Sequence, residues 1–378
     1  MSGHLRELIV DLDAIAANTQ VLATRSGSAG VMAVVKADAY GHGLVPSAQA
    51  AMAGGAQWLG VALLDEALEL RAGGVEDPVL AWLVGPGEPW VEALTRGIDL
   101  SVSDVWVLDE IATAAREVGR VARVHLKVDS GLGRSGAPVG DWPTLVDAAR
   151  KAELDGIVVV VGVWSHLAYA DAPGHPTIDR QLEVFREALD VAERAGVQPE
   201  VRHLANSAAT LTRPDTHFDL TRPGLAVYGL SPLRDAPPAA LGLLPAMSLQ
   251  ARMALVKRVP AGHGVSYMHR YVTNRETTLG LVPLGYADGV PRDATNVGPV
   301  QVGGRRRTIA GVVCMDQFVV DLGDDPVSVG DLVWLFGPGD SGEPTAQDWA
   351  DATGTISYEI VTRMGPRIRR RYVGGPAS

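Results

Sequence analysis

The first part of the chain alternates short runs of β-branched residues with longer amphipathic stretches. The longer stretches, such as Val105–Val118 and Ile178–Ala195, have the spacing of helices, and Gly196 stands where the second helix would end. Strands that alternate with helices predict a parallel sheet, and eight such units predict a closed (β/α)8 barrel of the TIM type, an α/β fold. The eight expected strands are Val31–Ala37, Leu59–Leu63, Val79–Val84, Leu100–Ser103, Val121–Val128, Ile157–Leu167, Glu200–Ala205 and Phe218–Tyr228.

The pattern changes after Arg234–Pro245, a stretch rich in proline and alanine. From Leu249 onward, short strand-like runs are separated by glycine turns, and one helix is expected over Ala346–Met364. We therefore expect two domains, the barrel over residues 1–240 and a mainly β domain over residues 241–378. The expected strands of the second domain are Ala251–Val259, Thr278–Leu284, Pro299–Val302, Thr308–Val313, Phe318–Leu322 and Asp331–Phe336.

Composition excludes several classes of protein. A net charge of −11 argues against a nucleic-acid partner, and no apolar run approaches the ~20 residues of a membrane helix. The first residues lead into no apolar targeting core, so a cytoplasmic location is expected. The single cysteine, Cys314, forms no intramolecular disulfide, and a small buried hydrophobic role is the expectation for it. No cluster of side chains predicts a metal site.

A lysine at the end of the first expected strand is the first candidate for chemistry. Lys36 follows four apolar residues and precedes a glycine-punctuated loop, which places it at the C-terminal mouth of the barrel, where active sites lie. Burial of an amine lowers its pKa and favours Schiff-base formation. A lysine whose stem packs along the barrel rim would occupy the same position, so position alone leaves both interpretations open.

The segment Ala33–Gly43, AVVKADAYGHG, resembles the lysine signature of the alanine racemase family, whose cofactor is pyridoxal 5′-phosphate (PLP). Asp38 stands where the family often has asparagine. The resemblance implies that Lys36 binds the cofactor covalently and that Tyr40 reaches its phosphate. It continues in order along the later strand ends, up to the segment Tyr358–Thr362, and so covers nearly the whole chain.

The segment Val124–Gly136 resembles the family's loop after the fifth strand. The resemblance implies that Arg134 contacts the cofactor phenolate and the substrate carboxylate, a role that suits a planar and permanently charged group. Lys127 matches a lysine that is carbamylated in many members. An ordinary lysine paired with Asp129 or another carboxylate remains the alternative.

Three later segments carry the remaining barrel residues, Trp164–Asp171, His203–Ala209 and Asp219–Gly229. By resemblance, His166 packs against the cofactor ring. The last two segments follow strands seven and eight, where barrels commonly bind phosphate. The resemblance assigns the phosphate to the Ser207 hydroxyl, the backbone amides near Gly224 and Leu225, and Tyr358. Tyr358 could instead serve only as a cap on a domain interface.

Arg222 says most about the type of reaction. In many PLP enzymes a carboxylate keeps the pyridine nitrogen protonated, which makes the ring a strong electron sink. An arginine donates a hydrogen bond without giving up its proton, so the nitrogen stays largely unprotonated. The weaker sink favours racemisation over transamination. By resemblance, His203 supports Arg222.

Racemisation needs a proton donor or acceptor on each face of the substrate. Lys36 supplies one, and Gly264–His269 resembles the segment with the other, which makes Tyr267 the second catalytic residue. A phenol with an ordinary pKa near ~10 needs nearby positive charge or hydrogen bonds to act as a base. In the family this tyrosine comes from the neighbouring subunit, which implies a homodimer. Tyr286 and Met315 are implied to restrict the pocket to small substrates, and Met315 to donate a main-chain hydrogen bond.

The resemblance therefore implies a two-base, PLP-dependent alanine racemase that supplies D-alanine for peptidoglycan. A PLP decarboxylase of similar build would be expected to carry an acidic partner for the pyridine nitrogen, so Arg222 and Tyr267 argue against it. A broad-spectrum or serine racemase stays open, because pocket size depends on loops. A non-catalytic PLP carrier built on the barrel would leave the second domain and Met315 without a purpose.

Overall fold

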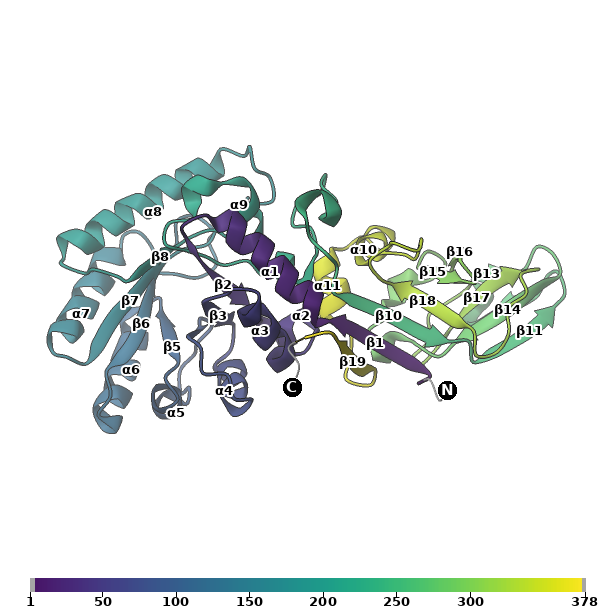
Figure 1. Cartoon of the computed structure of the whole chain (residues 1–378), viewed down its shortest axis with the longest axis horizontal. Helices are drawn as coiled ribbons and strands as arrows, with labels where there is room; N and C mark the ends of the chain where they lie inside the picture. Colours follow the sequence, from purple (N-terminus) through teal and green to yellow (C-terminus); the bar gives the residue numbers. More distant parts are fainter. Residues whose placement is uncertain (1–3, 376–378) are drawn as a thin grey trace. The chain divides into compact units, whose positions relative to one another are not determined.

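A computed structural model describes residues 4–375, which divide into two compact units (Figure 1). The barrel unit comprises residues 15–39 and 43–244. The β unit comprises residues 4–14, 40–42 and 245–375, so it takes in both ends of the described chain and a short segment near the start of the barrel sequence. Within the described residues, no helix combines the length and the apolar character that a membrane crossing requires.

The barrel unit is built on eight parallel strands in the order β8-β7-β6-β5-β4-β3-β2-β9. Backbone hydrogen bonds join the two ends of this sheet, from Arg222 N to Ala205 O at 2.8 Å and from Asp219 N to Arg202 O at 3.0 Å. The expected (β/α)8 barrel is thereby confirmed. The strands are β2 (Gly30–Val34), β3 (Trp58–Val61), β4 (Val79–Ala81), β5 (Asp99–Val102), β6 (Ala122–Lys127), β7 (Val158–Trp164), β8 (Val201–His203) and β9 (Leu220–Thr221).

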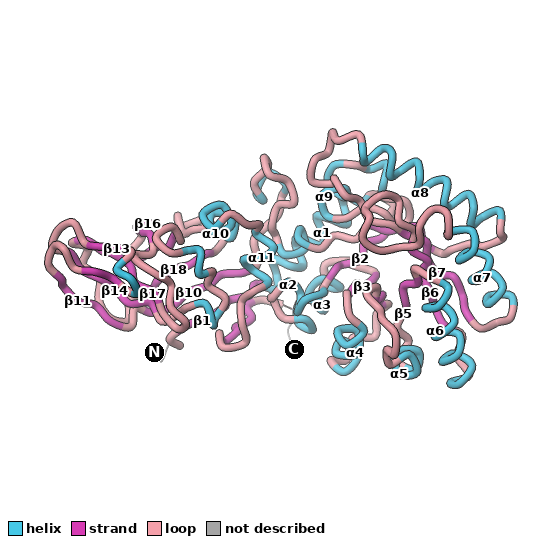
Figure 2. Tube along the Cα trace, turned by 180° about the vertical axis from the view of Figure 1, so that it is seen from behind, coloured by secondary structure: helices cyan, strands magenta, loops and turns pink. Residues whose placement is uncertain are grey.

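Helices flank these strands (Figure 2). The helix α6 begins after Asp104, whose carboxylate accepts a hydrogen bond from Trp106 N, and ends at Gly119 in the left-handed conformation. Inside the barrel, Met32 and Leu80 pack together with neighbouring apolar side chains. The helices of the first 244 residues are α1 (Leu12–Ser26), α3 (Leu44–Ala53), α4 (Leu64–Ala72), α5 (Trp90–Thr95), α6 (Val105–Val118), α7 (Trp142–Leu154), α8 (Thr177–Arg194) and α9 (Ser207–Thr212).

A left-handed turn, α2 (Lys36–Tyr40), follows the first barrel strand. Ala37, Asp38, Ala39 and Tyr40 all have φ between 53° and 54°, a conformation that costs an L-residue roughly 1–2 kcal/mol. The expected strand through Ala37 is therefore wrong at its end, since β2 stops at Val34. Hydrogen bonds support the turn, because Asp38 Oδ1 accepts from Leu44 N at 2.8 Å and Asp38 O accepts from Gly43 N at 2.9 Å.

The β unit contains a six-stranded sheet in the order β16-β15-β18-β10-β1-β19, a three-stranded sheet β11-β14-β17 and a hairpin β12-β13. The first strand of the chain, β1, pairs antiparallel with β10 and parallel with β19. The strands are β1 (Arg6–Asp11), β10 (Met247–Arg252), β11 (Leu255–Val259), β12 (Gly264–Val265), β13 (Tyr271–Val272), β14 (Thr277–Val282), β15 (Pro299–Val302), β16 (Arg305–Thr308), β17 (Phe318–Gly323), β18 (Leu332–Phe336) and β19 (Arg369–Val373).

Several expected elements differ from the observed ones. The strand expected over Ala251–Val259 is two strands, and the one expected over Thr308–Val313 lies earlier, as β16. The helix expected over Ala346–Met364 is two helices, α10 (Ala346–Thr353) and α11 (Ser357–Thr362), because Gly354 has φ 71° and caps the first. The eighth expected barrel strand is the short β9 followed by a 3₁₀ turn at Leu225–Tyr228.

Candidate active site

Four cationic side chains gather at the C-terminal ends of the barrel strands. Lys36 follows β2, Lys127 is the last residue of β6, Arg134 lies in the loop after β6, and Arg222 follows β9. Burial and the nearby Arg134 lower the pKa of the Lys36 amine, and Glu66 partly opposes this shift. The mouth of the barrel is therefore a cationic site in which an amine is readily deprotonated.

Glu66 fixes the backbone next to Lys36, a contact that the sequence did not suggest. Its Oε1 accepts a hydrogen bond from Ala37 N at 2.5 Å. Its Oε2 accepts from Ala62 N at 2.9 Å and from Leu63 N at 3.0 Å, in the loop between β3 and α4. One carboxylate thus joins the start of the left-handed turn to the next strand end. The signal that could have indicated this contact is the position of Glu66 in the first turn of a helix, where a carboxylate accepts hydrogen bonds from free backbone amides.

Lys127 is a buried amine whose hydrogen bond within the described residues goes to Ser135 Oγ, at 2.6 Å. Its Nζ lies 4.1 Å from the ring centroid of Trp164. Burial, with smaller contributions from Arg222 and Arg134, lowers the pKa of Lys127 to about 7. Asp129, the expected alternative partner, accepts hydrogen bonds from the backbone amides of residues 131–133 instead.

Arg222 is buried and held by three acceptors from the ends of two strands, β7 and β8. Its Nη2 donates to Ser165 O at 2.7 Å and to Leu204 O at 3.2 Å, and its Nη1 lies 3.1 Å from His203 Nδ1. Burial lowers the pKa of Arg222 to about 9, so the guanidinium remains charged at neutral pH. The expected contact between His203 and Arg222 is present.

The contact with Arg222 fixes the direction of a hydrogen-bonded chain through the barrel. A guanidinium only donates, so His203 Nδ1 accepts and His203 Nε2 carries the proton. That proton faces His125 Nδ1 at 3.0 Å, and His125 Nε2 then donates to Asp99 Oδ2 at 3.3 Å. Burial and Arg222 hold the pKa of His203 well below its usual range, so this ring is neutral at pH 7. Arg123 Nε closes the chain at 2.8 Å from Asp99 Oδ1.

Sequence reasoning missed His125 and Asp99. The available signal was that His125 lies two positions before Lys127 in one strand, and therefore on the same face.

His166 is placed beside Arg222, with its Nδ1 3.4 Å from Arg222 Nη2. Burial and the surrounding cations hold the pKa of His166 well below its usual range. Trp164 joins the group, because the Arg222 Cζ lies 4.8 Å from its ring centroid and the His203 ring stacks on it at 5.6 Å. His166 is therefore a neutral ring among cations rather than a charged one.

The residues expected to bind phosphate fall into two groups. In the barrel unit, Ser207 Oγ accepts hydrogen bonds from Gly224 N at 2.8 Å and Ala226 N at 3.3 Å, and Leu225 begins the adjoining 3₁₀ turn. Because Ser207 accepts both bonds, its own proton is available to an anion. In the β unit, the rings of Tyr40 and Tyr358 have centroids 6.1 Å apart. Burial raises the pKa of Tyr40, which keeps this phenol a donor.

The other expected residues lie on the β unit and are exposed there. Tyr267 is 69% exposed, Met315 53% and Tyr286 44%. Tyr286 N donates to Cys314 O at 3.0 Å, and Ala287 N donates to Met315 O at 3.0 Å. The segments of Tyr286 and Met315 are therefore directly joined.

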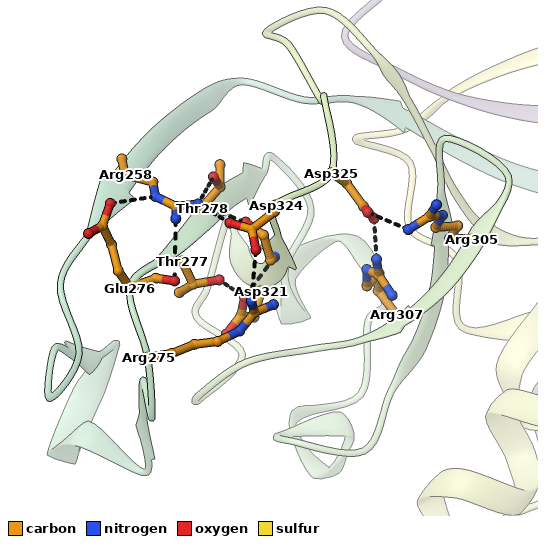
Figure 3. A network of polar contacts seen from close by, with 11 residues as sticks. Arg258, Arg275, Glu276, Thr277, Thr278, Arg305, Arg307, Asp321, Asp324 and Asp325 are labelled. Atoms are coloured by element: carbon orange, nitrogen blue, oxygen red, sulfur yellow. Dashed lines mark hydrogen bonds and ion pairs between the residues drawn. The ribbon is translucent and has the colours of Figure 1, made fainter.

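The β unit also has a polar hollow of about 720 Å³ beside its three-stranded sheet (Figure 3). Its charged groups are already paired, since Asp324 lies 2.7 Å from both Arg258 and Arg275. Asp325 pairs in the same way with Arg305 and Arg307. The pairs of Asp324 are exposed and contribute little stability each, whereas the Asp325 side chain is largely buried. Both carboxylates fasten loops rather than present free charge.

Comparison with known proteins identifies the family. Residues 10–232 match the sequence model for the N-terminal domain of alanine racemase, and residues 246–372 match that for its C-terminal domain. The chain belongs to the alanine racemase family.

Relatives in this family match almost end to end. The alanine racemase of Frankia casuarinae is 62% identical over 366 residues, 97% of this chain and 95% of that protein. That of Salinispora tropica is 63% identical over 370 residues, 97% and 98% of the two chains. The crystal structure of alanine racemase from D-cycloserine-producing Streptomyces lavendulae superposes with a TM-score of 0.98 at 56% identity, covering 100% of this chain and 99% of that one.

Proposed function

We propose that this member of the alanine racemase family interconverts L-alanine and D-alanine with PLP as its cofactor, in the cytoplasm, and so supplies D-alanine for peptidoglycan. The observation that supports it best is the cationic barrel mouth, in which Arg222 is held as a charged hydrogen-bond donor by Ser165 O and Leu204 O. The relatives named above, each called an alanine racemase, support the choice of alanine as substrate.

The residues present fit PLP. The cofactor carries two anionic groups, a phosphate and a phenolate, and the barrel mouth provides Lys36, Lys127, Arg134 and Arg222. Asp129, on the same loop as Arg134, accepts hydrogen bonds from backbone amides, as Glu66 does beside Lys36. When bound, PLP supplies an electron-accepting ring that stabilises negative charge at the substrate α-carbon. In this assignment Lys36 holds it covalently, Ser207, Tyr40, Tyr358 and the amides at 224–225 hold the phosphate, and His166 lies against the ring.

The reaction then rests on two proton carriers. Lys36 Nζ has a lowered pKa, so its amine is deprotonated more readily than an exposed lysine and can take a proton from D-alanine. Tyr267 Oη is assigned the opposite face and L-alanine, and in a homodimer it would come from the neighbouring subunit. Arg134 and the main chain of Met315 hold the substrate carboxylate, while Tyr286 and Met315 limit the size of the side chain.

Arg222 directs the outcome of the reaction. A guanidinium with a pKa of about 9 gives up no proton to a ring nitrogen near neutral pH. The negative charge at the α-carbon is then less delocalised and is reprotonated at that carbon, which favours racemisation over transamination.

Lys127 is assigned a carbamate. With a pKa of about 7, a large fraction of its amine is neutral and nucleophilic at neutral pH. Attack of the neutral Nζ on the carbon of carbon dioxide forms one C–N bond, converts one C=O bond into a carboxylate C–O and releases one N–H proton. Together with the proton lost when the ammonium is deprotonated, two protons leave and a cation becomes an anion. That anion would hold Arg134 in place. Incubation with 13C-bicarbonate and NMR should give one carbamate signal that is missing in Lys127→Met.

The test combines absorbance with α-proton exchange in deuterated water. We expect a band near ~420 nm that borohydride abolishes, with exchange and inversion of both alanine enantiomers and little reaction with L-serine. Lys36→Ala should lose the band and the activity together. Tyr267→Phe should keep the band and lose exchange from L-alanine only, whereas the control Tyr372→Phe should behave as wild type.

Other results would overturn parts of the proposal. Inversion fastest with serine would change the substrate, and a band without any exchange would favour the PLP carrier. Exchange of both enantiomers by Tyr267→Phe would exclude the two-base assignment.

A further inference from the structure

The loop that carries Tyr267 is held in a strained backbone conformation. Ser266 has φ 60° and ψ −167°, Met268 has φ 60° and His269 has φ 43°. The Ser266 conformation is one that essentially only glycine adopts without strain, and such positions cost on the order of 1–3 kcal/mol each. Tyr267 and Met268 are 69% and 85% exposed, so packing of their own side chains does not hold the loop.

The Ser266 side chain joins the loop of Tyr267 to the segment of Val312 by a hydrogen bond, which is called the tie below. Its hydroxyl donates to Val312 O at 2.8 Å. Since the hydroxyl has one proton, its oxygen is left to accept from the thiol of Cys314, whose Sγ is 3.3 Å away. Cys314 Sγ also lies 3.5 Å from Val312 O. The only cysteine of the chain thus has a structural partner on the loop of the candidate base.

The segment that receives this tie also carries the other substrate residues of the β unit. Cys314 O and Met315 O accept the amides of Tyr286 and Ala287 at 3.0 Å. The approach is close, because a Cβ on Gly285 would lie 2.3 Å from each of those two oxygens. Residues 312–315 therefore form one support for Tyr286, Met315 and, through Ser266, Tyr267.

The far side of the loop has its own anchors. Asn296 Nδ2 donates to Arg270 O at 3.0 Å, and its Oδ1 accepts from Gly311 N at 2.6 Å. Tyr271 Oη donates at 2.6 Å to Oδ2 of Asp321, one of the residues labelled in Figure 3. The loop is thus fixed after His269 by two side chains and before Tyr267 by Ser266.

We propose that Ser266 is a positioning residue for Tyr267, which it orients by tying the strained loop to Val312 O with Cys314 as its partner. This inference rests on the proposed function, because it takes Tyr267 as the base on one face. A strained loop with an exposed phenol needs such a tie, since a misplacement of about 1 Å can cost on the order of 100-fold in rate.

The variant Ser266→Gly distinguishes the effect of losing the hydrogen bond to Val312 O from an effect on the stability of the fold. Ser266→Gly removes the hydroxyl and also the strain, so we expect the PLP-loaded enzyme to melt at the same or a higher temperature. Washout of the α-proton of L-alanine should nevertheless fall about 10- to 100-fold, with KM within about threefold of wild type. Washout from D-alanine, which is assigned to Lys36, should change less than about threefold.

The assay has to follow exchange of the α-proton with solvent rather than turnover. The equilibrium between the two enantiomers couples the steady-state rates in the two directions, so turnover would not reveal a loss on one face alone. Ser266→Ala also loses the hydroxyl but keeps the strain, so it should show the same one-sided loss together with a lower melting temperature. Cys314→Ser keeps a donor at its position and should stay close to wild type. Met268→Gly is the matched control, because it relieves strain in the same loop and leaves the tie intact.

The outcomes separate this inference from the proposed function. If Tyr267→Phe shows no one-sided loss, the assignment of the base fails. If Tyr267→Phe shows that loss and Ser266→Gly exchanges both enantiomers like wild type, the role of Ser266 is excluded. An equal loss for both enantiomers in Ser266→Gly, or an equal loss in Met268→Gly, would assign the effect to general loop flexibility and overturn the proposal.

Discussion

Replacing Lys127 with methionine should stabilise the protein, and more at pH 6 than at pH 9. In the folded chain, burial lowers the pKa of Lys127 from 10.5 to about 7. Below pH 7 both the folded and the unfolded states bind this proton, so the cost of the buried charge is present in full. Between pH 7 and pH 10.5 only the unfolded state holds the proton, and the stability of the wild type therefore rises with pH.

The size of the effect follows from the shift. Each pH unit inside this window contributes about 1.4 kcal/mol, so the wild type gains at most about 3 kcal/mol relative to Lys127→Met between pH 6 and pH 9. Methionine keeps the apolar stem on the face of Trp164 and removes the charge. The free energy of unfolding, measured by urea denaturation in buffer free of carbon dioxide, provides the assay.

Lys257→Met is the control, because Lys257 is exposed on β11. It should change the free energy of unfolding by less than about 0.5 kcal/mol at both pH values. A stability difference between wild type and Lys127→Met that is the same at pH 6 and pH 9 would refute the reasoning, since it would mean that the folded chain binds the Lys127 proton as tightly as the unfolded chain.

Two further substitutions test the barrel interior. Gly162→Ala would place a Cβ 2.1 Å from His125 Nδ1, so displacement of that buried ring should cost roughly 3 kcal/mol or more in urea denaturation. Gly174→Ala, with open space around its Cβ, should cost less than about 0.5 kcal/mol, and equal costs would contradict the packing argument. Arg222→Glu should increase transamination, measured as pyruvate formed per D-alanine produced, and an unchanged ratio would contradict the role assigned to the guanidinium.

The barrel was predictable because each strand is a local apolar run. Both faces of the strands are buried, since helices cover the outer face and side chains of the strands fill the interior. The helix α6 was predicted at its observed bounds, since an amphipathic pattern ends at Gly119. In contrast, β1 was not predicted, because it is stabilised by pairing with β10 and β19, more than 230 residues away. β19 was not predicted either, because its three consecutive arginines do not give the apolar alternation that indicates a strand.

The candidate site was predicted only in part, for a similar reason. Lys36 was found because a lysine at the end of an apolar strand is visible along the sequence, and Lys127 was found by resemblance to the family's loop after the fifth strand. The continuation of the chain from His203 to His125 and Asp99 was not found, since these residues come from three different strands and meet only through the register of the sheet. The tie from Ser266 to Val312 likewise joins residues 46 positions apart across two loops.

The left-handed turn after β2 has a consequence for the chirality of the chain itself. Ala37 has φ 53° and ψ 53°, which is the mirror image of the ordinary helical conformation of an L-residue. D-alanine adopts this backbone geometry without strain. A semisynthetic chain with D-alanine at the exposed position 37 should therefore keep this turn at lower conformational cost. A member of a family named for alanine racemisation thus contains, beside its candidate catalytic lysine, a backbone position that suits the D-enantiomer better than the L-residue present there.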